Sequence, residues 1–251
     1  MKRIGFLGCG KIGQALLKHI KELDGVDVAF VQDPVYTKAA GDTFPVVTKG
    51  DKDLYATADL IIECANASVL KEWGVTMLQA TDVLTFSVTA FSDPSFWDTM
   101  VQCKQTSGHH LYIPHGAILG LDGIFDGRAM WTAIKIVTTK SPKSLGRTDT
   151  ERTVLYDGPT RKACELFPRN VNVHASVALA GIGFDRTESV IIVDPAVETN
   201  AHHIYLDSDS THMELIISSV AKGAVSGAYT PQSACGSLDR VLQHTRDVLF
   251  V

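Results

Sequence analysis

Two adjacent histidines near the end of the chain, His202 and His203, have the side chains best suited to move protons at neutral pH. They follow Asp194-Pro195, a dipeptide typical of a turn, and are bracketed by Asn200 and Ile204. An unperturbed imidazole has a pKa of about 6.5, so it can act as a general base or a general acid near pH 7. If this stretch is a β-strand, the two rings point to opposite faces, and only one of them can serve a site on a given face.

A glycine-rich segment near the start of the chain, Gly8-Cys9-Gly10-Lys11-Ile12-Gly13, has the composition of a phosphate-binding turn. It follows the apolar stretch 3–7, and apolar residues recur behind it at helical spacing as far as Ile20. In such a turn the first glycine permits a tight bend, the second lets the backbone approach a pyrophosphate, and the third lets the helix pack on the strand. We therefore expect a dinucleotide cofactor to bind at Gly8, Gly10, Lys11, Ile12 and Gly13.

An acidic residue, Asp33, closes the second expected strand, 28–31, at the distance from Gly8 where a carboxylate would bind the hydroxyls of the adenosine ribose. A carboxylate at this position repels the 2′-phosphate of NADP, and the residue that follows is Pro34 rather than an arginine. NAD is therefore the expected cofactor, with NADP possible. The alternative is that Asp33 only caps the end of the strand.

The first 112 residues alternate between apolar strands and amphipathic helices, which predicts a dinucleotide-binding domain. Strands are expected at 3–7, 28–31, 59–64 and 83–87, and helices follow the glycine segment and span 68–79 and 93–105. The alternation predicts an α/β fold of the Rossmann type, with a doubly wound parallel sheet. Ligands of such sheets bind at the carboxyl ends of the strands, so 63–65 and 87–90 are candidates to line the nicotinamide end.

Residues 113–230 have the pattern of a second, α+β domain, which we expect to hold the substrate and to form the dimer. Strands are expected at 131–139, 189–194, 204–207 and 213–219 in a mixed or antiparallel sheet, with a polar loop at 140–151 and a helix at 167–179. Pro231 occupies the favoured first turn of a final helix, 231–251, which we expect to pack back on the first domain.

The composition excludes several classes of partner. Of the 251 residues 45% are hydrophobic and 20% charged, and the net charge of −5 argues against nucleic acid or an anionic membrane surface. The five cysteines are scattered and no signal peptide or membrane-spanning run is apparent, so we expect a cytoplasmic protein. His109 and His110 lack a carboxylate or cysteine at ligand spacing, and we expect no metal.

Four blocks of this sequence resemble the L-aspartate dehydrogenase family, and the resemblance runs from Lys2 to the final helix. The blocks are the glycine segment, Pro114 to Asp122, Phe167 to Gly183, and Asp194-Pro195 with Asn200, His202 and Ile204. The resemblance implies oxidation of L-aspartate with NAD or NADP to iminoaspartate, which hydrolyses to oxaloacetate and ammonia or feeds NAD biosynthesis. It also implies a homodimer paired through the sheet of the second domain, in which the apolar stretch 213–219 would take part.

The resemblance also implies roles for individual residues. His202 matches the catalytic histidine of the family, and Ala117 and Asn172 match residues at its nicotinamide site. The sequence departs from the family pattern at His115, where a serine is expected, and at His174, where an alanine is expected. The segment 207–210 replaces glycines that usually follow the catalytic strand, a change that we expect to alter only a hairpin.

This chemistry requires a general base and partners for two carboxylates. Hydride leaves Cα of aspartate only once the amine is neutral, and hydrolysis of the imine needs an activated water, so His202 would serve both steps. The amide of Asn172 can hold the nicotinamide carboxamide or a substrate carboxylate. Lys140, His115 and Thr187 are the candidate substrate-binding residues, although Lys140 could equally be a solvated loop charge.

Two other functions are compatible with a two-domain plan of this kind. An aldehyde dehydrogenase would need an activated cysteine at the start of a helix, and Cys164 is the candidate in the second half. A sensor or scaffold would bind NAD without turning over any amino acid or carbonyl compound.

Overall fold

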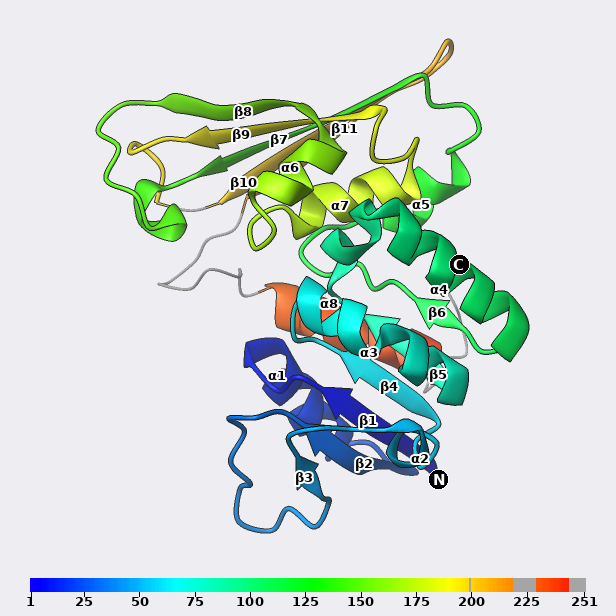
Figure 1. The fold of residues 1–251 in the computed structure, drawn as a ribbon. Helices are drawn as coiled ribbons and strands as arrows, with labels where there is room; N and C mark the ends of the chain where they lie inside the picture. Colours follow the sequence, from blue (N-terminus) through cyan, green and yellow to red (C-terminus); the bar gives the residue numbers. More distant parts are fainter. Residues whose placement is uncertain (199, 219–228, 244–251) are drawn as a thin grey trace. The chain divides into compact units, whose positions relative to one another are not determined.

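The computed structural model describes residues 1–198, 200–218 and 229–243, which form two compact units (Figure 1). Of the described residues, the first unit comprises 1–114 and 233–243, and the second comprises 115–198, 200–218 and 229–232. The division after Pro114 lies two residues beyond the boundary expected from the sequence. The ends of the expected segments 213–219 and 231–251 reach residues 219 and 244–251, which lie outside the described part of the chain.

The sheet of the first unit has six parallel strands in the order β3-β2-β1-β4-β5-β6. This order reverses direction between β1 and β4, the point at which parallel sheets of this type bind ligands beyond the carboxyl ends of their strands. The predicted Rossmann-type α/β fold is confirmed. The strands are β1 (Lys2–Leu7), β2 (Val26–Gln32), β3 (Val46–Val47), β4 (Leu60–Glu63), β5 (Asp82–Thr85) and β6 (Leu111–Tyr112).

Helices connect these strands, and local side-chain caps explain where two of the helices begin. The side chain of Asn66 accepts hydrogen bonds from the first turn of α3, and that of Asp93 does so at α4. Gly108 ends α4 with a φ of 74°, in the left-handed region that glycine tolerates. The helices are α1 (Lys11–Ile20), α2 (Lys52–Tyr55), α3 (Ala67–Ala80), η1 (Val88–Ser92) and α4 (Pro94–Ser107).

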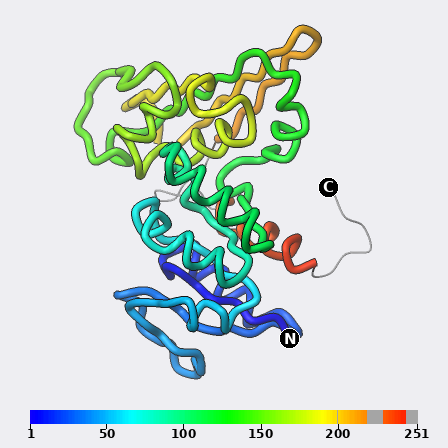
Figure 2. Tube along the Cα trace, turned by 45° about the vertical axis from the view of Figure 1, so that its right-hand side comes forward, coloured from blue at the N-terminus to red at the C-terminus, as the bar shows by residue number. Residues whose placement is uncertain are grey.

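The last described helix, α8 (Tyr229–Val241), returns to the first unit (Figure 2). Its residues Ala234 and Leu238 are fully buried in the same core cluster as Ile4 of β1. His19 Nε2 on α1 lies 2.7 Å from the carboxylate of Asp239 on α8, which joins the two helices at their surface. The chain therefore closes the first unit with a segment far from it in sequence.

The sheet of the second unit is mixed, with the strand order β11-β10-β7-β9-β8. The central pair β7 and β9 is parallel, and the other neighbouring strands are antiparallel. The edge strand β8 was not expected from the sequence. The strands are β7 (Ala133–Lys140), β8 (Thr153–Pro159), β9 (Thr187–Val193), β10 (Ala201–Asp207) and β11 (His212–Ser218).

The helices of the second unit lie along one face of this sheet (Figure 1). They bury Ile134 and Ile136 of β7 together with Ile204 and Leu206 of β10. Among the described residues, no helix of the unit covers the opposite face, where Ile216 of β11 is 61% exposed. The helices are α5 (Leu121–Asp126), η2 (Pro142–Leu145), α6 (Thr160–Leu166) and α7 (Asn172–Ala180).

Candidate active site

The glycine segment forms a tight turn between β1 and α1 that leaves room for a ligand at one position. Gly8 has a φ of 85°, and a side chain there would collide with Ala65. A Cβ on Gly13 would lie 2.9 Å from the carbonyl oxygen of Gly8. A Cβ on Gly10 would meet no protein atom within 4 Å. The first and third glycines are thus required by the fold, whereas the second faces open space, as a turn that cradles a pyrophosphate must.

The turn also begins a helix whose first residues can receive an anion. Gly10 is the N-cap residue of α1 and has no side chain to cap the helix, and the first turn contains no acidic residue. Backbone N–H groups and the positive end of the helix dipole meet at such a terminus, which favours phosphate. The residues present therefore fit a dinucleotide, with its phosphates at Gly10 to Gly13.

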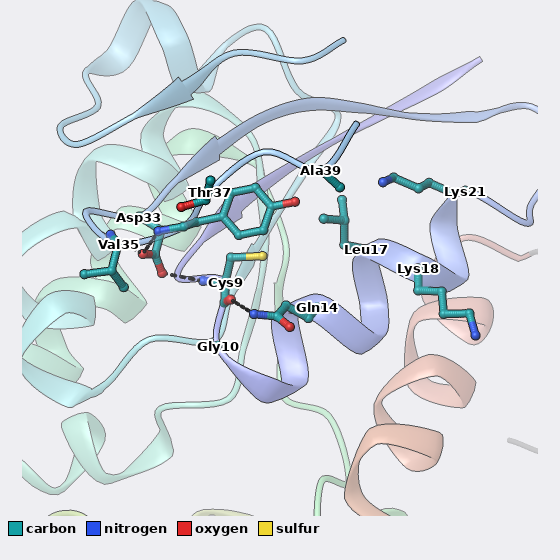
Figure 3. Close-up of a pocket in the computed structure, with 11 residues that line it drawn as sticks. Cys9, Gly10, Gln14, Leu17, Lys18, Lys21, Asp33, Val35, Thr37 and Ala39 are labelled. Carbon is teal, nitrogen blue, oxygen red and sulfur yellow. Dashed lines mark hydrogen bonds between the residues drawn. The ribbon is translucent and has the colours of Figure 1, made fainter. Parts of the chain in front are cut away.

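Asp33 ties this turn to the loop that follows β2. One carboxylate oxygen accepts the N–H of Cys9 at 2.7 Å, and the other accepts the N–H groups of Val35 and Tyr36 at 2.8 and 2.9 Å (Figure 3). A carboxylate offers about four acceptor positions, so this one can still bind a ribose hydroxyl. Asp33 is therefore both a structural anchor of two loops and a possible cofactor ligand.

A cavity of about 550 Å³ opens beside Asp33 and along α1, from Gly10 to Lys21 (Figure 3). Its size is in the range of small-molecule and cofactor sites, and it lies where the adenosine half of a dinucleotide would be held. It is lined by Cys9, Gly10, Gln14, Leu17, Lys18, Lys21, Asp33, Val35, Tyr36, Thr37 and Ala39.

Glu63 organises the strand ends that were expected to line the nicotinamide. Its fully buried carboxylate accepts hydrogen bonds from the hydroxyl groups of Thr85 and Ser87 and from the N–H of Ala65. Burial raises the pKa of this carboxyl group, and the hydrogen bonds oppose the shift. Glu63 therefore holds β4 and β5 in register at their carboxyl ends rather than facing a ligand.

In the second unit, strand alternation separates the two histidines as predicted. β10 buries every second residue, so His202 lies on the covered face, 6% exposed, and His203 lies on the opposite face. His202 pairs across the sheet with Thr138 of β7, and His203 pairs with Ile216 of β11. His202 is thus the histidine that the helices of the unit enclose.

The ring of His202 is held by buried polar groups from other elements. Its Nδ1 lies 2.8 Å from Oγ1 of Thr138, which lies 2.6 Å from Nε2 of His174 on α7. The other nitrogen of His174 lies 2.9 Å from Oγ of Ser189 on β9. From the sequence, His174 is recognisable only as a departure from the family pattern, and Thr138 and Ser189 are not recognisable as site residues. The buried alternation of β7, which places a threonine in line with Ile134 and Ile136, was the available signal.

Lys140 lies two residues beyond Thr138 on the same buried face of β7 and is 5% exposed. Its ammonium group donates to the backbone oxygen of Asn170 at 3.3 Å and to the side-chain oxygen of that residue at 3.2 Å. Burial lowers the pKa of Lys140 to about 8. A buried lysine whose hydrogen-bond partners among the described residues are neutral is suited to bind a carboxylate.

The two enclosed histidines are uncharged at neutral pH. Burial, followed by the charge of Lys140, lowers the pKa of His202 to about 4. Burial, followed by electrostatic interactions with His202 and Lys140, places the pKa of His174 well below its ordinary value. His202 is therefore already in its basic form near pH 7.

The remaining candidates occupy different places in the second unit. His115 and Ala117 are partly buried in the loop before α5, and Nε2 of His115 lies 3.7 Å from the carboxylate of Asp122. Asn172 is the first residue of α7, two positions before His174. Thr187 is fully buried at the opposite end of β9 from Val193, so it has no surface from which to contact a substrate. Among the described residues its hydroxyl oxygen has no hydrogen-bond partner.

Two further chemistries find no support among the described residues. No group of three or more histidine, cysteine or carboxylate side chains in residues 1–198, 200–218 and 229–243 could hold a metal ion. Cys164 is 4% exposed and lies in the middle of α6 rather than at the start of a helix, so it lacks the setting of a catalytic thiol.

No helix in the described part of the chain is long and apolar enough to cross a membrane.

Comparison with known proteins assigns each half of the chain to a family. Residues 8–114 match the model of the homoserine dehydrogenase NAD-binding domain, and residues 126–241 match that of the aspartate dehydrogenase C-terminal domain. The first match supports an NAD or NADP cofactor in the unit that contains the glycine turn. The second covers the strands that place Lys140 and His202.

Curated relatives and solved structures agree with these assignments. L-aspartate dehydrogenases from Methanococcoides burtonii and Nitrosopumilus maritimus are 35% and 31% identical to this chain, covering 83% and 81% of it and 84% and 82% of their own lengths. The crystal structure of aspartate dehydrogenase from Thermotoga maritima matches over 100% of both chains, with a TM-score of 0.82 and 25% identity. Dihydrodipicolinate reductase from Paenisporosarcina shares the fold alone, with a TM-score of 0.56 and 11% identity. This chain therefore belongs to the L-aspartate dehydrogenase family.

Proposed function

We propose that this protein catalyses the NAD(P)-dependent oxidative deamination of L-aspartate, with His202 as the acid–base residue. The observation that supports it best is the presence of His202 and Lys140 on one buried face of the same sheet. One supplies a neutral base, and the other supplies a cation for a substrate carboxylate. Family membership supports the choice of aspartate, since the relatives named above are L-aspartate dehydrogenases.

Each of the two residues has a defined task in this reaction. A bound nicotinamide supplies the acceptor for the hydride that leaves Cα of aspartate. His202 takes a proton from the substrate ammonium group so that the nitrogen lone pair can assist the departure of hydride, and it later activates the water that hydrolyses the imine. Lys140 binds a carboxylate of the substrate. His115 is a second candidate for carboxylate binding.

The proposed cofactor contacts are assigned to individual residues. Gly8, Gly10, Lys11, Ile12 and Gly13 would hold the pyrophosphate, and Asp33 would bind the adenosine ribose. Ala117 and Asn172 would contact the nicotinamide half, as the family resemblance implies. The carboxylate of Asp33 favours NAD over NADP.

The open face of the second unit supports a homodimer. Val137, His203 and Ile216 are aligned across three strands on this face, and Ile216 is largely exposed. An exposed apolar side chain such as Ile216 gains by being covered by a second copy of the chain. None of the five cysteines forms a disulfide, which supports a cytoplasmic location.

The proposed activity is tested by a panel of amino acids offered with NAD and with NADP, read by the absorbance of the reduced nicotinamide. We expect turnover of L-aspartate and little turnover of L-glutamate, L-alanine or aspartate semialdehyde. The product should be detected as oxaloacetate and ammonia. Tight NAD binding without turnover of any amino acid would instead identify a sensor, and semialdehyde oxidation that is lost in Cys164→Ala would identify a thiol-dependent enzyme.

A further inference from the structure

A continuous chain of buried hydrogen bonds runs from His202 to a backbone carbonyl group. Beyond Thr138, His174 and Ser189, it continues from Oγ of Ser189 to Oγ1 of Thr160 at 2.7 Å, and Thr160 donates to the carbonyl oxygen of Thr187 at 2.9 Å. The five side chains come from five different elements, β10, β7, α7, β9 and α6, and none is more than 6% exposed. No solvent is therefore available to replace one of these bonds cheaply.

The far end of the chain fixes the direction of the hydrogen bonds near it. A carbonyl oxygen can only accept, so the single hydroxyl proton of Thr160 points to Thr187. Thr160 must then accept from Ser189, whose only proton is used in that bond. Ser189 in turn must accept from Nδ1 of His174, which therefore has its proton on Nδ1.

The same reasoning continues from His174 to His202. Because burial keeps His174 neutral, a proton on Nδ1 leaves Nε2 as an acceptor, and Thr138 donates to it. Thr138 has no second proton, so it must accept from Nδ1 of His202. The proton of the neutral His202 ring therefore lies on Nδ1, and the lone pair lies on Nε2.

We infer that this chain selects the tautomer of His202 whose Nε2 is a base, and that His174, Thr138, Ser189 and Thr160 are positioning residues for the reaction. The inference rests on the proposed role of His202 as the acid–base group. It deepens that role because it specifies which atom takes the proton and which residues determine the choice.

The exposure of the two ring nitrogens agrees with this assignment. Nε2 of His202 has no hydrogen-bond partner among the described residues. It nevertheless keeps some contact with solvent, unlike the hydroxyl oxygen of Thr187, which is both unpartnered and sealed off. It is therefore the edge of the ring that a substrate can reach. When Nε2 takes a proton, Nδ1 continues to donate to Thr138, so no hydroxyl group has to rotate during the step.

The opposite direction would leave the base unusable. If Thr138 donated to His202, the proton of the neutral ring would lie on Nε2, and the lone pair would face the interior. That arrangement requires Thr160 to donate to Ser189, which leaves the carbonyl oxygen of Thr187 and Oγ1 of Thr160 2.9 Å apart without a proton between them. The anchor at Thr187 thus excludes the reversed chain.

NMR of the full-length protein with nitrogen-isotope-labelled histidine reads the tautomer directly, because protonated and unprotonated ring nitrogens have well-separated chemical shifts. His202→Gln identifies the signals of His202. In the wild type at neutral pH we expect a proton on Nδ1 and none on Nε2. A wild-type spectrum with the proton on Nε2 would overturn the inference.

Thr160→Val is the most specific perturbation, because it removes the anchoring hydroxyl group four hydrogen bonds away from His202. Ser189 can then donate to His174, and the whole chain reverses. We expect the Nε2–H tautomer of His202 to become favoured by roughly three- to tenfold, the range that one neutral hydrogen bond supports. Thr160→Ser should restore the wild-type spectrum. Thr187→Val, which removes a buried hydroxyl group that is not part of the chain, should leave the tautomer unchanged.

Kinetics then show whether the tautomer matters for catalysis. In Thr160→Val we expect kcat to fall roughly three- to tenfold with little change in KM, and Thr160→Ser to recover it. An unaltered His202 spectrum in Thr160→Val, or equal changes in Thr160→Val and Thr187→Val, would refute the selection mechanism. Full activity in His202→Ala would refute the proposed function itself, and the wild-type spectrum would still report the tautomer.

Discussion

Lys140 and His202 occupy neighbouring positions on the buried face of the second unit's sheet, and the charge of Lys140 affects the protonation of His202. β7 and β10 pair so that Thr138, two residues before Lys140, lies opposite His202. Burial and the charge of Lys140 lower the pKa of His202 to about 4. Burial also lowers the pKa of Lys140 to about 8. The arrangement combines a neutral base with a cation whose charge is lost in mildly alkaline solution.

The pH dependence of kcat/KM for aspartate should therefore be limited by Lys140 on the alkaline side. His202 is deprotonated throughout the range from about pH 5 upward, so a rise with pH reports the substrate amine instead. Above about pH 8 the free enzyme loses the charge of Lys140, and the rise should stop. In Lys140→Arg the charge persists, so kcat/KM should continue to rise above pH 8. Lys140→Met removes the charge at every pH and should raise KM for aspartate roughly ten- to a hundredfold. The same alkaline limit in wild type and Lys140→Arg would exclude Lys140.

The two buried histidines should make the protein less stable in mild acid. In the unfolded chain a histidine takes a proton as pH falls through about 6.5, whereas folded His202 stays neutral down to about pH 4. Over that window the free energy of unfolding should fall by up to about 1.4 kcal/mol per pH unit for His202, and the lowered pKa of buried His174 adds a loss of the same sign. Denaturant unfolding at several pH values should show that the free energy of unfolding depends less steeply on pH in His202→Gln than in the wild type. Parallel curves for the two proteins would contradict the burial of a neutral His202.

Replacing Asp33 should change the choice between the two cofactors. Asp33→Ser removes a charged acceptor from the ribose and the repulsion of the NADP phosphate, so the ratio of NADP to NAD affinity should rise roughly ten- to a hundredfold. The side chain of Asp33 also accepts hydrogen bonds from the N–H groups of Cys9, Val35 and Tyr36. Losing these bonds should loosen the two loops and lower the affinity for NAD and for NADP to a similar extent. The ratio of the NADP and NAD affinities, measured by titration, therefore reports the ribose contact separately from the effect on the loops. An unchanged ratio would show that Asp33 serves the loops alone.

We expect the oligomeric state to depend on the open face of the second unit. Sedimentation at micromolar concentration should give a dimer for the wild type and a monomer for Ile216→Glu, which places a charge in the centre of the proposed contact. Leu166→Glu is a matched control, since Leu166 is 55% exposed but lies on α6, on the covered side of the sheet. A monomeric wild type, or equal dissociation of the dimer in both variants, would contradict a dimer contact at this face.

The sequence predicted those features that depend on local patterns. The glycine turn, α1 and the strands β1, β4 and β5 follow from residue spacing alone, and the alternation of β10 separated His202 from His203. β8 and α6 were missed; β8 is an edge strand whose residues are all exposed or half exposed, so it lacks an apolar repeat. The hydrogen bonds that join Thr138 to His174 depend on the parallel pairing of β7 with β9 and on the placement of α7 against both. No local pattern encodes contacts between residues so far apart in sequence.

The most direct test of the account compares His202→Ala with His203→Ala in steady-state oxidation of L-aspartate, with NAD binding measured separately for each protein. His202→Ala should lower kcat by about 10²-fold or more while NAD affinity changes little, because the residue moves protons and does not hold the cofactor. His203→Ala should retain most of the activity, because its ring lies on the opposite face of β10. Full activity in His202→Ala, or an equal loss of kcat in both variants, would contradict the assignment of His202 as the acid–base residue.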